Sequence, residues 1–234
     1  IQNNSLEFET WPLLPPNGNE SHPYFARREF ESKLEELCSK QDKIMVWLND
    51  PAHNPTGLSM SPKGRSTCLE SFVESALNNP GVGHTLLIDS AYSLYADETH
   101  AWADTILESL ENGMMWPENF LVTVAVSLSK SHTIYGLRTG SLVSMHPEKE
   151  VTDRLETVLC VTARQTWSAT PRVSQYCVSE MHSSEEGGNA WGEERDRLKK
   201  LLDDRRNVLI SECEKLGVPL NPTMDGFFAW IEAC

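Results

Sequence analysis

The chain has 234 residues, of which 39% are hydrophobic, so it can bury a core the size of one large domain. Its 34 acidic residues outnumber its 20 basic ones, and a net charge of −14 disfavours nucleic acids and anionic membranes as partners. No apolar run approaches the roughly 20 residues that span a bilayer, so we expect no membrane segment.

The cysteines stand at positions 38, 68, 160, 177, 213 and 234. They form no C-x-x-C pair and no zinc-like spacing with histidine, so we expect unpaired thiols and no metal site. This usage is typical of a reducing compartment, and we expect a cytoplasmic location. Because the chain starts at Ile1 rather than at methionine, an organelle-targeting segment upstream stays open.

The hydrophobic pattern predicts strands that alternate with helices. We expect strands at 43–48, 85–88, 121–126, 141–145 and 226–231, with a further short strand near 6–11. We expect helices at 28–40, 62–79, 99–112, 149–163, 170–183 and 189–216. The helices between the strands are long enough to cross over, so the pattern indicates an α/β fold with a mainly parallel sheet covered on both faces.

Helical periodicity also predicts which side chains face a core. In the first two helices these are Phe30, Leu34, Leu37, Cys38, Leu69, Phe72, Val73 and Ala76. In the segments at 149–163 and 189–216 they are Val151, Leu155, Val158, Leu159, Leu198, Leu201, Leu202, Val208, Leu209 and Cys213. We also expect Trp47, Trp167 and Trp230 to lie in the core rather than in a ring-stacking site.

Three of the predicted strands end in polar groups that are unusual beside a buried sheet. Asn54 lies in the HNPTG loop after one strand, and Asp89 and Tyr92 lie in DSAY after the next. Lys130 follows the third strand in SLSK, and Arg138 comes eight residues later. Because the carboxyl ends of parallel strands meet at one edge, where open sheets bind ligands, we expect these side chains to converge.

An amine, a carboxylate, a phenol, an amide and a guanidinium are the groups that a pyridoxal phosphate site requires. A partly desolvated lysine is favoured in its neutral form and makes an imine with the aldehyde. The carboxylate keeps the ring nitrogen protonated, the phenol and the amide bind the ring oxygen, and the arginine grips the phosphate.

Each of these residues also has an ordinary explanation when it is taken alone. Asp89 suits a helix N-cap, Tyr92 suits a core, and Asn54-Pro55 suits a turn. Arg138 suits an ion pair, and Lys130 suits a solvated loop. The joint occurrence in order favours the cofactor site over these separate explanations.

With these motifs the chain resembles the class I and II aminotransferases, which are fold type I pyridoxal-phosphate enzymes, and in particular their aspartate and aromatic aminotransferase branch. The residues that carry the resemblance are HNPTG at 53–57, DSAY at 89–92, SLSK at 127–130 and YGLRTG at 135–140. The resemblance implies a pyridoxal phosphate cofactor, an amino acid donor, a 2-oxo acid acceptor and a homodimer.

By this resemblance Lys130 is the Schiff-base lysine and the acid/base that moves a proton between the substrate α-carbon and the cofactor. Asp89 is the partner of the pyridine nitrogen, and Tyr92 and Asn54 bind the ring 3-oxygen. The phosphate is held by Ser127 and Arg138. The resemblance also predicts a cis peptide bond between Asn54 and Pro55, an isomer that is uncommon in folded proteins.

The resemblance divides the chain into a partial cofactor-binding large domain at 1–188 and a partial, smaller α+β domain at 189–234. Family members carry an upstream phosphate loop, a ring-stacking aromatic, a tyrosine lent by the partner subunit and a downstream carboxylate-binding arginine. We identify none of these here, so we expect the chain to lack N- and C-terminal segments of the family. Whether this chain alone is active, and which amino acid is the donor, stay open.

Two alternatives to an aminotransferase remain at this point. The same fold supports a pyridoxal-phosphate-dependent β-eliminating lyase or a cyclopropane-forming synthase. A non-catalytic relic that keeps the fold for binding or assembly is the other alternative, and the presence of Lys130, Asp89 and Arg138 speaks against it.

Overall fold

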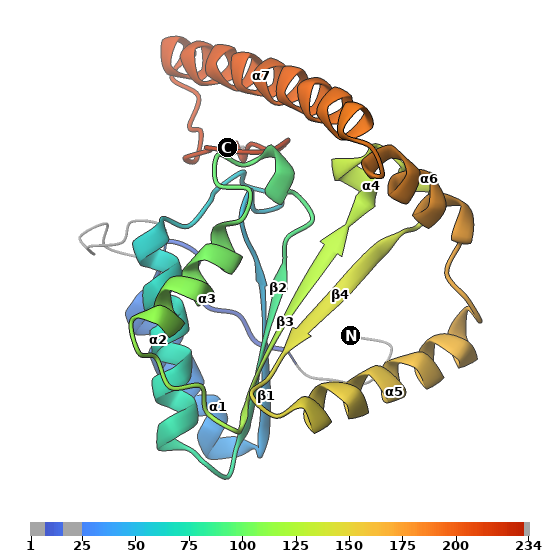
Figure 1. Cartoon of the computed structure of the whole chain (residues 1–234). Coiled ribbons are helices and arrows are strands. Elements are labelled where there is room, and N and C mark those ends of the chain that lie inside the picture. The colour runs from blue at the N-terminus through green and yellow to red at the C-terminus, as the bar shows by residue number, and fades with distance from the viewer. Residues whose placement is uncertain (1–7, 16–24, 232–234) are drawn as a thin grey trace. The chain divides into compact units, whose positions relative to one another are not determined.

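The structure is a computed structural model, which describes residues 8–15 and 25–231 (Figure 1). The chain divides into two compact units that interleave along the sequence. The first unit comprises Ile1–Ile44, Met60–His84 and Asp104–Phe120. The second unit comprises Met45–Ser59, Thr85–Ala103 and Leu121–Cys234, and it contains every residue of the predicted cofactor site. The predicted boundary between residues 188 and 189 stays a prediction.

Four strands form one sheet in the order β1-β2-β3-β4. They are β1 (Lys43–Asn49), β2 (Gly83–Asp89), β3 (Phe120–Ser127) and β4 (Gly140–Met145). β3 and β4 are antiparallel, with Ser127 opposite Gly140, and Figure 1 shows their arrows pointing in opposite directions. Past the strand ends, the Asp50 N–H donates to Asp89 O and the Ser90 N–H donates to Ala125 O. The carboxyl ends of β1, β2 and β3 are therefore neighbours.

The helices agree with the predicted segments to within a few residues, apart from the start of α7. They are α1 (Arg27–Lys40), α2 (Pro62–Asn78), α3 (Ala101–Glu111), α4 (Leu128–Ser131), α5 (Lys149–Thr166), α6 (Arg172–His182) and α7 (Glu185–Leu216). α4 and the 3-10 turns η2 (Ser93–Tyr95) and η3 (Tyr135–Leu137) escaped prediction, because segments this short carry no periodicity. Over the described residues, no helix has both the length and the apolar character that crossing a membrane requires.

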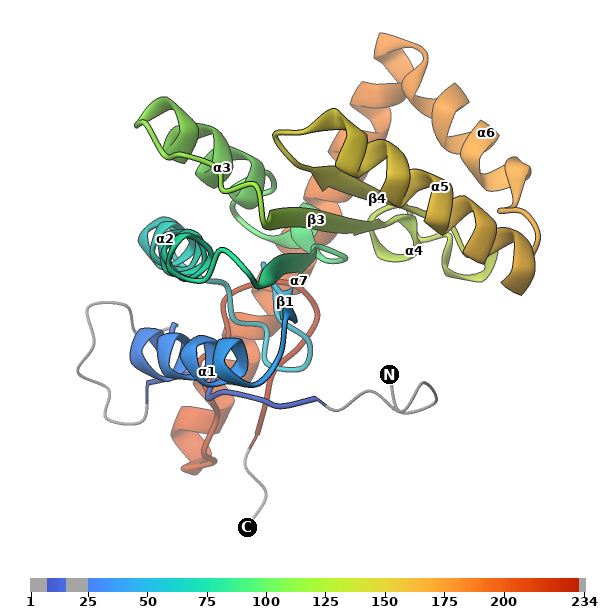
Figure 2. The same ribbon diagram turned by 90° about the horizontal axis from the view of Figure 1, so that it is seen from below.

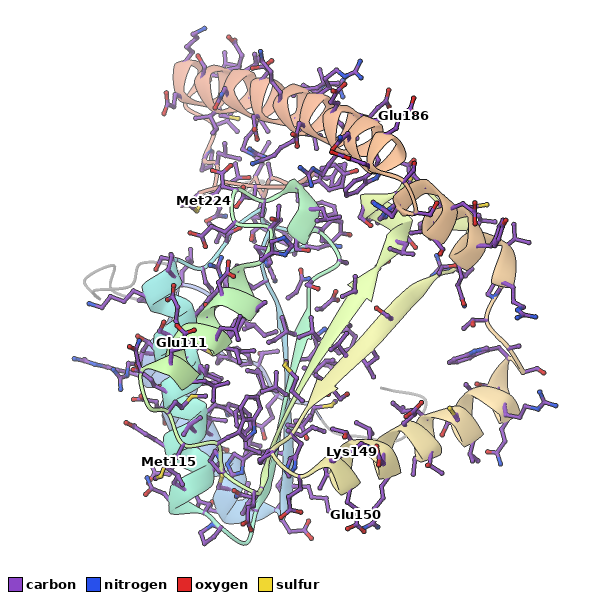
Figure 3. All side chains as sticks on the ribbon, viewed as in Figure 1. Glu111, Met115, Lys149, Glu150, Glu186 and Met224 are labelled. Carbon is purple, nitrogen blue, oxygen red and sulfur yellow. The ribbon has the colours of Figure 1, made fainter. Side chains whose placement is uncertain are left out.

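The start of α7 corrects a sequence prediction. Gly187 and Gly188 lie inside its first turn instead of interrupting the chain before it. The Ser184 side chain caps the helix by accepting a hydrogen bond from the Gly187 N–H. The carboxylates of Glu185 and Glu186 are stabilised by the positive end of the helix dipole, and Figure 3 labels Glu186 there. The cap and the two carboxylates offset the roughly 1 kcal/mol that each glycine costs in a helix.

The core of the first unit is an aromatic cluster centred on Phe72. Its ring centroid lies 5.2 Å from that of Phe120, 5.6 Å from that of His84 and 6.1 Å from that of Phe30. Phe72 and Phe30 come from α2 and α1, which lie side by side in this unit (Figure 2). The predicted inward side chains of α2 are all buried, whereas in α1 only two of the four are fully buried, namely Phe30 and Leu34.

Several predicted core residues are exposed. In the described chain α5 buries none of its residues, and Val158 is 60% exposed, while in α7 only Cys213 is buried. Trp47, Trp167 and Trp230 are 52%, 62% and 47% exposed. Periodicity tells which face of a helix is apolar, but burial requires a facing element, which the pattern within one segment does not reveal.

Two predicted strands are also wrong within the described residues. The segment from Gly226 makes only an isolated bridge between Leu220 and Ile231, and a left-handed Gly226 (φ 68°) turns the chain there. Its aromatic side chains pack against tyrosines instead of pairing in a sheet. The residues at 8–11 have no regular structure, and the remainder of that predicted strand, including Leu6, lies outside the described residues.

Phe72→Ala is expected to lower the free energy of unfolding by about 3–5 kcal/mol, because it removes a buried ring that touches three others. Chemical denaturation followed by circular dichroism measures this change. Leu77→Ala on the same helix is the control: Leu77 is 49% exposed, and its loss is expected to change stability by no more than about 0.5 kcal/mol. Equal losses for the two variants would contradict the packing described here.

Candidate functional site

The loop after β1 is fastened to the end of β2 by one side chain. Asn49 Nδ2 donates to Asp89 O at 2.9 Å, and Asn49 Oδ1 accepts from the Asn54 N–H at 2.6 Å. The predicted cis peptide bond between Asn54 and Pro55 is confirmed, and Asp50-Pro51 is cis as well, which was not predicted. Asn49 thus sets the position of Asn54 relative to Asp89.

Asn54, Asp89 and Tyr92 form one group of polar side chains. Asn54 Nδ2 donates to the Tyr92 hydroxyl at 3.4 Å, and Asp89 Oδ1 accepts from the Ala91 N–H at 3.2 Å. Burial raises the pKa of the Tyr92 phenol, the hydrogen bond from Asn54 opposes that rise, and the negative charge of Asp89 adds to it. The phenol is therefore held neutral, close to both the amide and the carboxylate.

Lys130 and Arg138 form a second group, around the ring of Tyr135. Lys130 Nζ lies 4.6 Å from the ring centroid, and Arg138 Cζ lies 5.0 Å from it. Arg138 Nη1 also donates to Tyr135 O at 2.9 Å. Ser127 caps the short helix α4, because its hydroxyl accepts from the Ser129 N–H at 3.3 Å. Two cations that share one ring repel each other, which favours an anion beside them.

The residues that bear these two groups are joined by a tyrosine that sequence reasoning missed. The Tyr95 hydroxyl donates to Lys130 O at 2.9 Å, and Tyr95 lies one short helical turn after Tyr92. At the strand ends, Ser90 donates to Ala125 O from both its N–H and its hydroxyl, each at 3.0 Å. The three-residue spacing from Tyr92 to Tyr95 was the sequence signal that could have placed the two tyrosines on one face of a helical turn.

Three loop residues at this site have strained backbones. Ala52, Thr133 and Arg138 have φ values of 57°, 54° and 52°, and they are three of the four non-glycine residues with positive φ in the described chain. Such conformations cost about 1–3 kcal/mol each and persist mainly where the surroundings impose them, often at functional sites. Three of the four such residues therefore lie in the loops that carry or adjoin Asn54, Lys130 and Arg138.

Residues 223–228, here called the C-terminal strap, cover the loop that carries Asn54. The Met224 and Asp225 N–H groups donate to Gly57 O at 2.8 and 2.9 Å, and Figure 3 labels Met224 on this strap. Gly57 has φ 73°, and a Cβ atom there would lie 2.3 Å from Phe228 O, so only glycine fits. The ring of Phe228 also meets that of Tyr92 edge-on, with 5.2 Å between centroids.

A buried carboxylate anchors this strap. Asp225 accepts hydrogen bonds from the Ser59 hydroxyl at 2.5 Å and from the Asp97 N–H at 3.1 Å. Burial raises the pKa of Asp225, and these two hydrogen bonds oppose the rise. Ser59 and Asp225 are 166 positions apart, so no local pattern in the sequence predicts their contact.

Two sets of polar groups gather at this site. Within the described parts of the chain, no three histidine, cysteine, aspartate or glutamate side chains are grouped to hold a metal ion. The groups that do gather are an amide, a phenol and a carboxylate in one set, and two cations on an aromatic ring in the other.

Comparisons with known proteins agree with this description. The sequence profile of the family "Aminotransferase class I and II" matches residues 17–234. The aromatic-amino-acid aminotransferase of Paracoccus denitrificans is 27% identical over 191 residues, which are 81% of this chain and 45% of that protein. A crystal structure of an aminotransferase from Anaerococcus prevotii superposes with a TM-score of 0.80 at 28% identity, over 88% of this chain and 49% of the other.

The chain therefore belongs to the class I and II aminotransferase family. The predicted fold class is confirmed: it is an α/β fold with a mainly parallel sheet flanked by helices. A structure of the aromatic-amino-acid aminotransferase of Burkholderia pseudomallei, covalently bound to pyridoxal phosphate, shares the fold at a TM-score of 0.64 and 23% identity, over 84% of this chain and 47% of the other. The chain spans about half the length of the relatives it matches.

The environment of Tyr92 predicts how its titration responds to its neighbours. Asn54→Ala is expected to raise the pKa of the Tyr92 phenol, because it removes the hydrogen bond that lowers it. Asp89→Asn is expected to lower that pKa, because it removes a nearby negative charge. Carbon-13 NMR of labelled tyrosine, with Tyr92→Phe to assign the signal, measures both shifts. Shifts of the same sign in the two variants would contradict this arrangement.

Ser59→Ala is expected to lower the free energy of unfolding by about 1–3 kcal/mol at neutral pH, because the buried Asp225 carboxylate loses a donor. Since the folded chain raises the pKa of Asp225, the penalty for its charge appears as the pH rises through that pKa. The loss in Ser59→Ala is thus expected to shrink in acid. Denaturation of both proteins across pH measures this, and the exposed Ser183→Ala, expected to show no such trend, is the control.

Proposed function

We propose that this chain is part of a pyridoxal-phosphate-dependent aminotransferase that moves an amino group from an amino acid to a 2-oxo acid. The observation that carries the proposal is the placement of Lys130. It lies on a single helical turn at the end of β3, it shares an aromatic ring with Arg138, and its carbonyl is bonded to the hydroxyl of Tyr95. The family match supports the same conclusion.

The residues present suit this cofactor. Bound pyridoxal phosphate supplies an aldehyde that takes up an amino group and an electron-withdrawing ring. Asp89 would hold a proton on the ring nitrogen, and Asn54 and Tyr92, already paired, would bind the ring oxygen. Arg138 would grip the phosphate with paired hydrogen bonds, and the phosphate charge would relieve the repulsion between Arg138 and Lys130.

Ser127 and Lys130 complete these assignments. Ser127 precedes the single turn of α4, on the same segment as Lys130, and the family resemblance assigns it to the phosphate as well. Lys130 is assigned as the residue that attaches the cofactor and carries a proton to and from the substrate α-carbon. Tyr135 keeps the Lys130 ammonium over its ring when no anion is present.

Three further assignments belong to this proposal and rest on the family resemblance. The first is a homodimer, because active sites in the family lie at the subunit interface. The second is the division into a partial large domain at 1–188 and a partial small domain at 189–234. The third is a cytoplasmic location.

Lys130→Ala is expected to abolish the visible absorbance band that pyridoxal phosphate produces when it attaches to the protein. The control is Lys149→Ala: Lys149 begins α5, is exposed and pairs with Asp153, and this variant is expected to keep the band (Figure 3). Borohydride reduction followed by peptide mass spectrometry is expected to find the added mass on Lys130. Absence of a band in the unaltered chain, or added mass spread over several lysines, would contradict the assignment.

Turnover is tested on the full-length protein, supplied with an amino acid, with and without a 2-oxo acid acceptor. An aminotransferase is expected to release product continuously only when the acceptor is present. Sustained release of pyruvate and ammonia without an acceptor would instead identify an eliminating lyase.

A further inference from the structure

A pair of histidines lies directly beyond the turn that carries Lys130. His132 ends α4, two residues after Lys130, and its Nε2 lies 3.1 Å from Nε2 of His182, the last residue of α6. His132 stacks on the indole of Trp191 in α7, with 4.8 Å between centroids and 14° between planes. His182 meets the same indole edge-on, at 4.9 Å. Three elements thus meet at one contact, here called the histidine clamp.

The proton positions in the clamp follow from its hydrogen bonds. The Ser131 hydroxyl donates to Ser127 O at 3.1 Å, so its oxygen accepts from Nδ1–H of His132 at 2.8 Å. His132 therefore carries no proton on Nε2 when it is neutral, and that atom accepts from Nε2–H of His182. One added proton fits on Nδ1 of His182. A second would have to sit on Nε2 of His132, where two N–H groups would face each other.

The surroundings of His132 oppose that second proton. The Arg195 guanidinium of α7 lies 5.2 Å from the centroid of Trp191, although the Asp196 carboxylate pairs with it at 2.7 Å. Lys130 contributes a cation from the same turn as His132, and the Tyr95 hydroxyl of η2 is neutral and bonded to Lys130 O. Burial lowers the pKa of His132, and the positive charge of His182 lowers it further.

We propose that His132 is a positioning residue for Lys130, which it holds in place by fastening the lysine turn to α6 and α7 through His182 and Trp191. The clamp is closed when the pair carries one added proton or none, and it opens when both histidines are charged. The inference rests on the proposed function in one respect only: the clamp affects cofactor attachment because Lys130 is the residue proposed to attach the cofactor.

The direction of the pH dependence follows from the histidine. A base whose pKa is lowered in the folded form stabilises the fold fully above its ordinary pKa of about 6.5. That stabilisation is lost as the pH falls from there through the lowered value of His132. The turn that carries Lys130 is thus held at neutral pH and released in mild acid.

Hydrogen exchange of this chain without cofactor tests the clamp directly. The reporters are the His132 N–H, which donates to Leu128 O, and the Thr133 N–H, which donates to Lys130 O. Corrected for intrinsic rates, their protection is expected to be lower at about pH 5.5 than at about pH 8, because the folded chain lowers the pKa of His132. Equal protection at both pH values would overturn the proposal.

Variants separate the clamp from a general loss of structure. His182→Gln presents either an N–H or an oxygen to His132 and removes the charge of His182, so its protection is expected to fall less between the two pH values than in the unaltered chain. His132→Phe keeps the ring on Trp191 but loses the bond to His182, so protection is expected to be lower and independent of pH. The exposed His100→Gln is the control and is expected to behave like the unaltered chain. The same fall in His182→Gln as in the unaltered chain would overturn the proposal.

The effect on Lys130 is read from the rate at which the cofactor band appears. In the unaltered chain this rate is expected to fall in mild acid along with the exchange protection, and His182→Gln is expected to flatten the additional fall. If no band forms at any pH, the proposed function fails, while the exchange measurement still decides the clamp. If the band forms with the same pH profile in both proteins, His132 does not position Lys130.

Discussion

The candidate site depends on three backbone carbonyl groups that side chains from a neighbouring strand end hold in place. Asn49 and Ser90 donate to the carbonyl oxygens of Asp89 and Ala125, and Tyr95 donates to that of Lys130. Each bond contributes only about 1 kcal/mol to stability, but together they fix the lateral positions of the strand ends. The groups of Asn54 with Tyr92 and of Lys130 with Arg138 rest on chain segments that these bonds join.

Around Lys130 and Arg138, the charge at the site is opposite in sign to the net charge of the whole chain. A net charge of −14 disfavours anions in general, yet Lys130 and Arg138 place two cations on one tyrosine ring. Their mutual repulsion is relieved by a ligand with a concentrated negative charge, so these two residues favour such a ligand locally. The neutral phenol of Tyr92 and the carboxylate of Asp89 belong to the other group of polar side chains.

How much of the fold and of the candidate site could be predicted depends on how far apart in the sequence the interacting residues lie. The four strands of the sheet, most of the helices and the polar strand ends at Asp89 and Lys130 are local patterns, and they were predicted to within a few residues. The contact of Ser59 with Asp225 was not, because it joins positions that are far apart in the sequence. Trp47 was predicted to lie in the core because its side chain is apolar. Its exposure shows that an apolar side chain is not always buried.

The strained loops explain why the long-range contacts matter. Ala52 and Arg138 hold left-handed conformations that cost about 1–3 kcal/mol each, and a free loop would relax. Ala52 is kept in place because its N–H donates to Ser59, the residue that also anchors Asp225. Arg138 is kept in place because its side chain bonds to Tyr135 O and lies over that ring.

The loop that carries Asn54 is therefore held by a strap more than a hundred and fifty residues away, whereas the side chain of Arg138 bonds within its own turn. A change in the strap would thus reach Asn54 through Gly57 and Tyr92 through Phe228. Under the proposed function, the strap thus supports the side of the cofactor site that holds the ring oxygen.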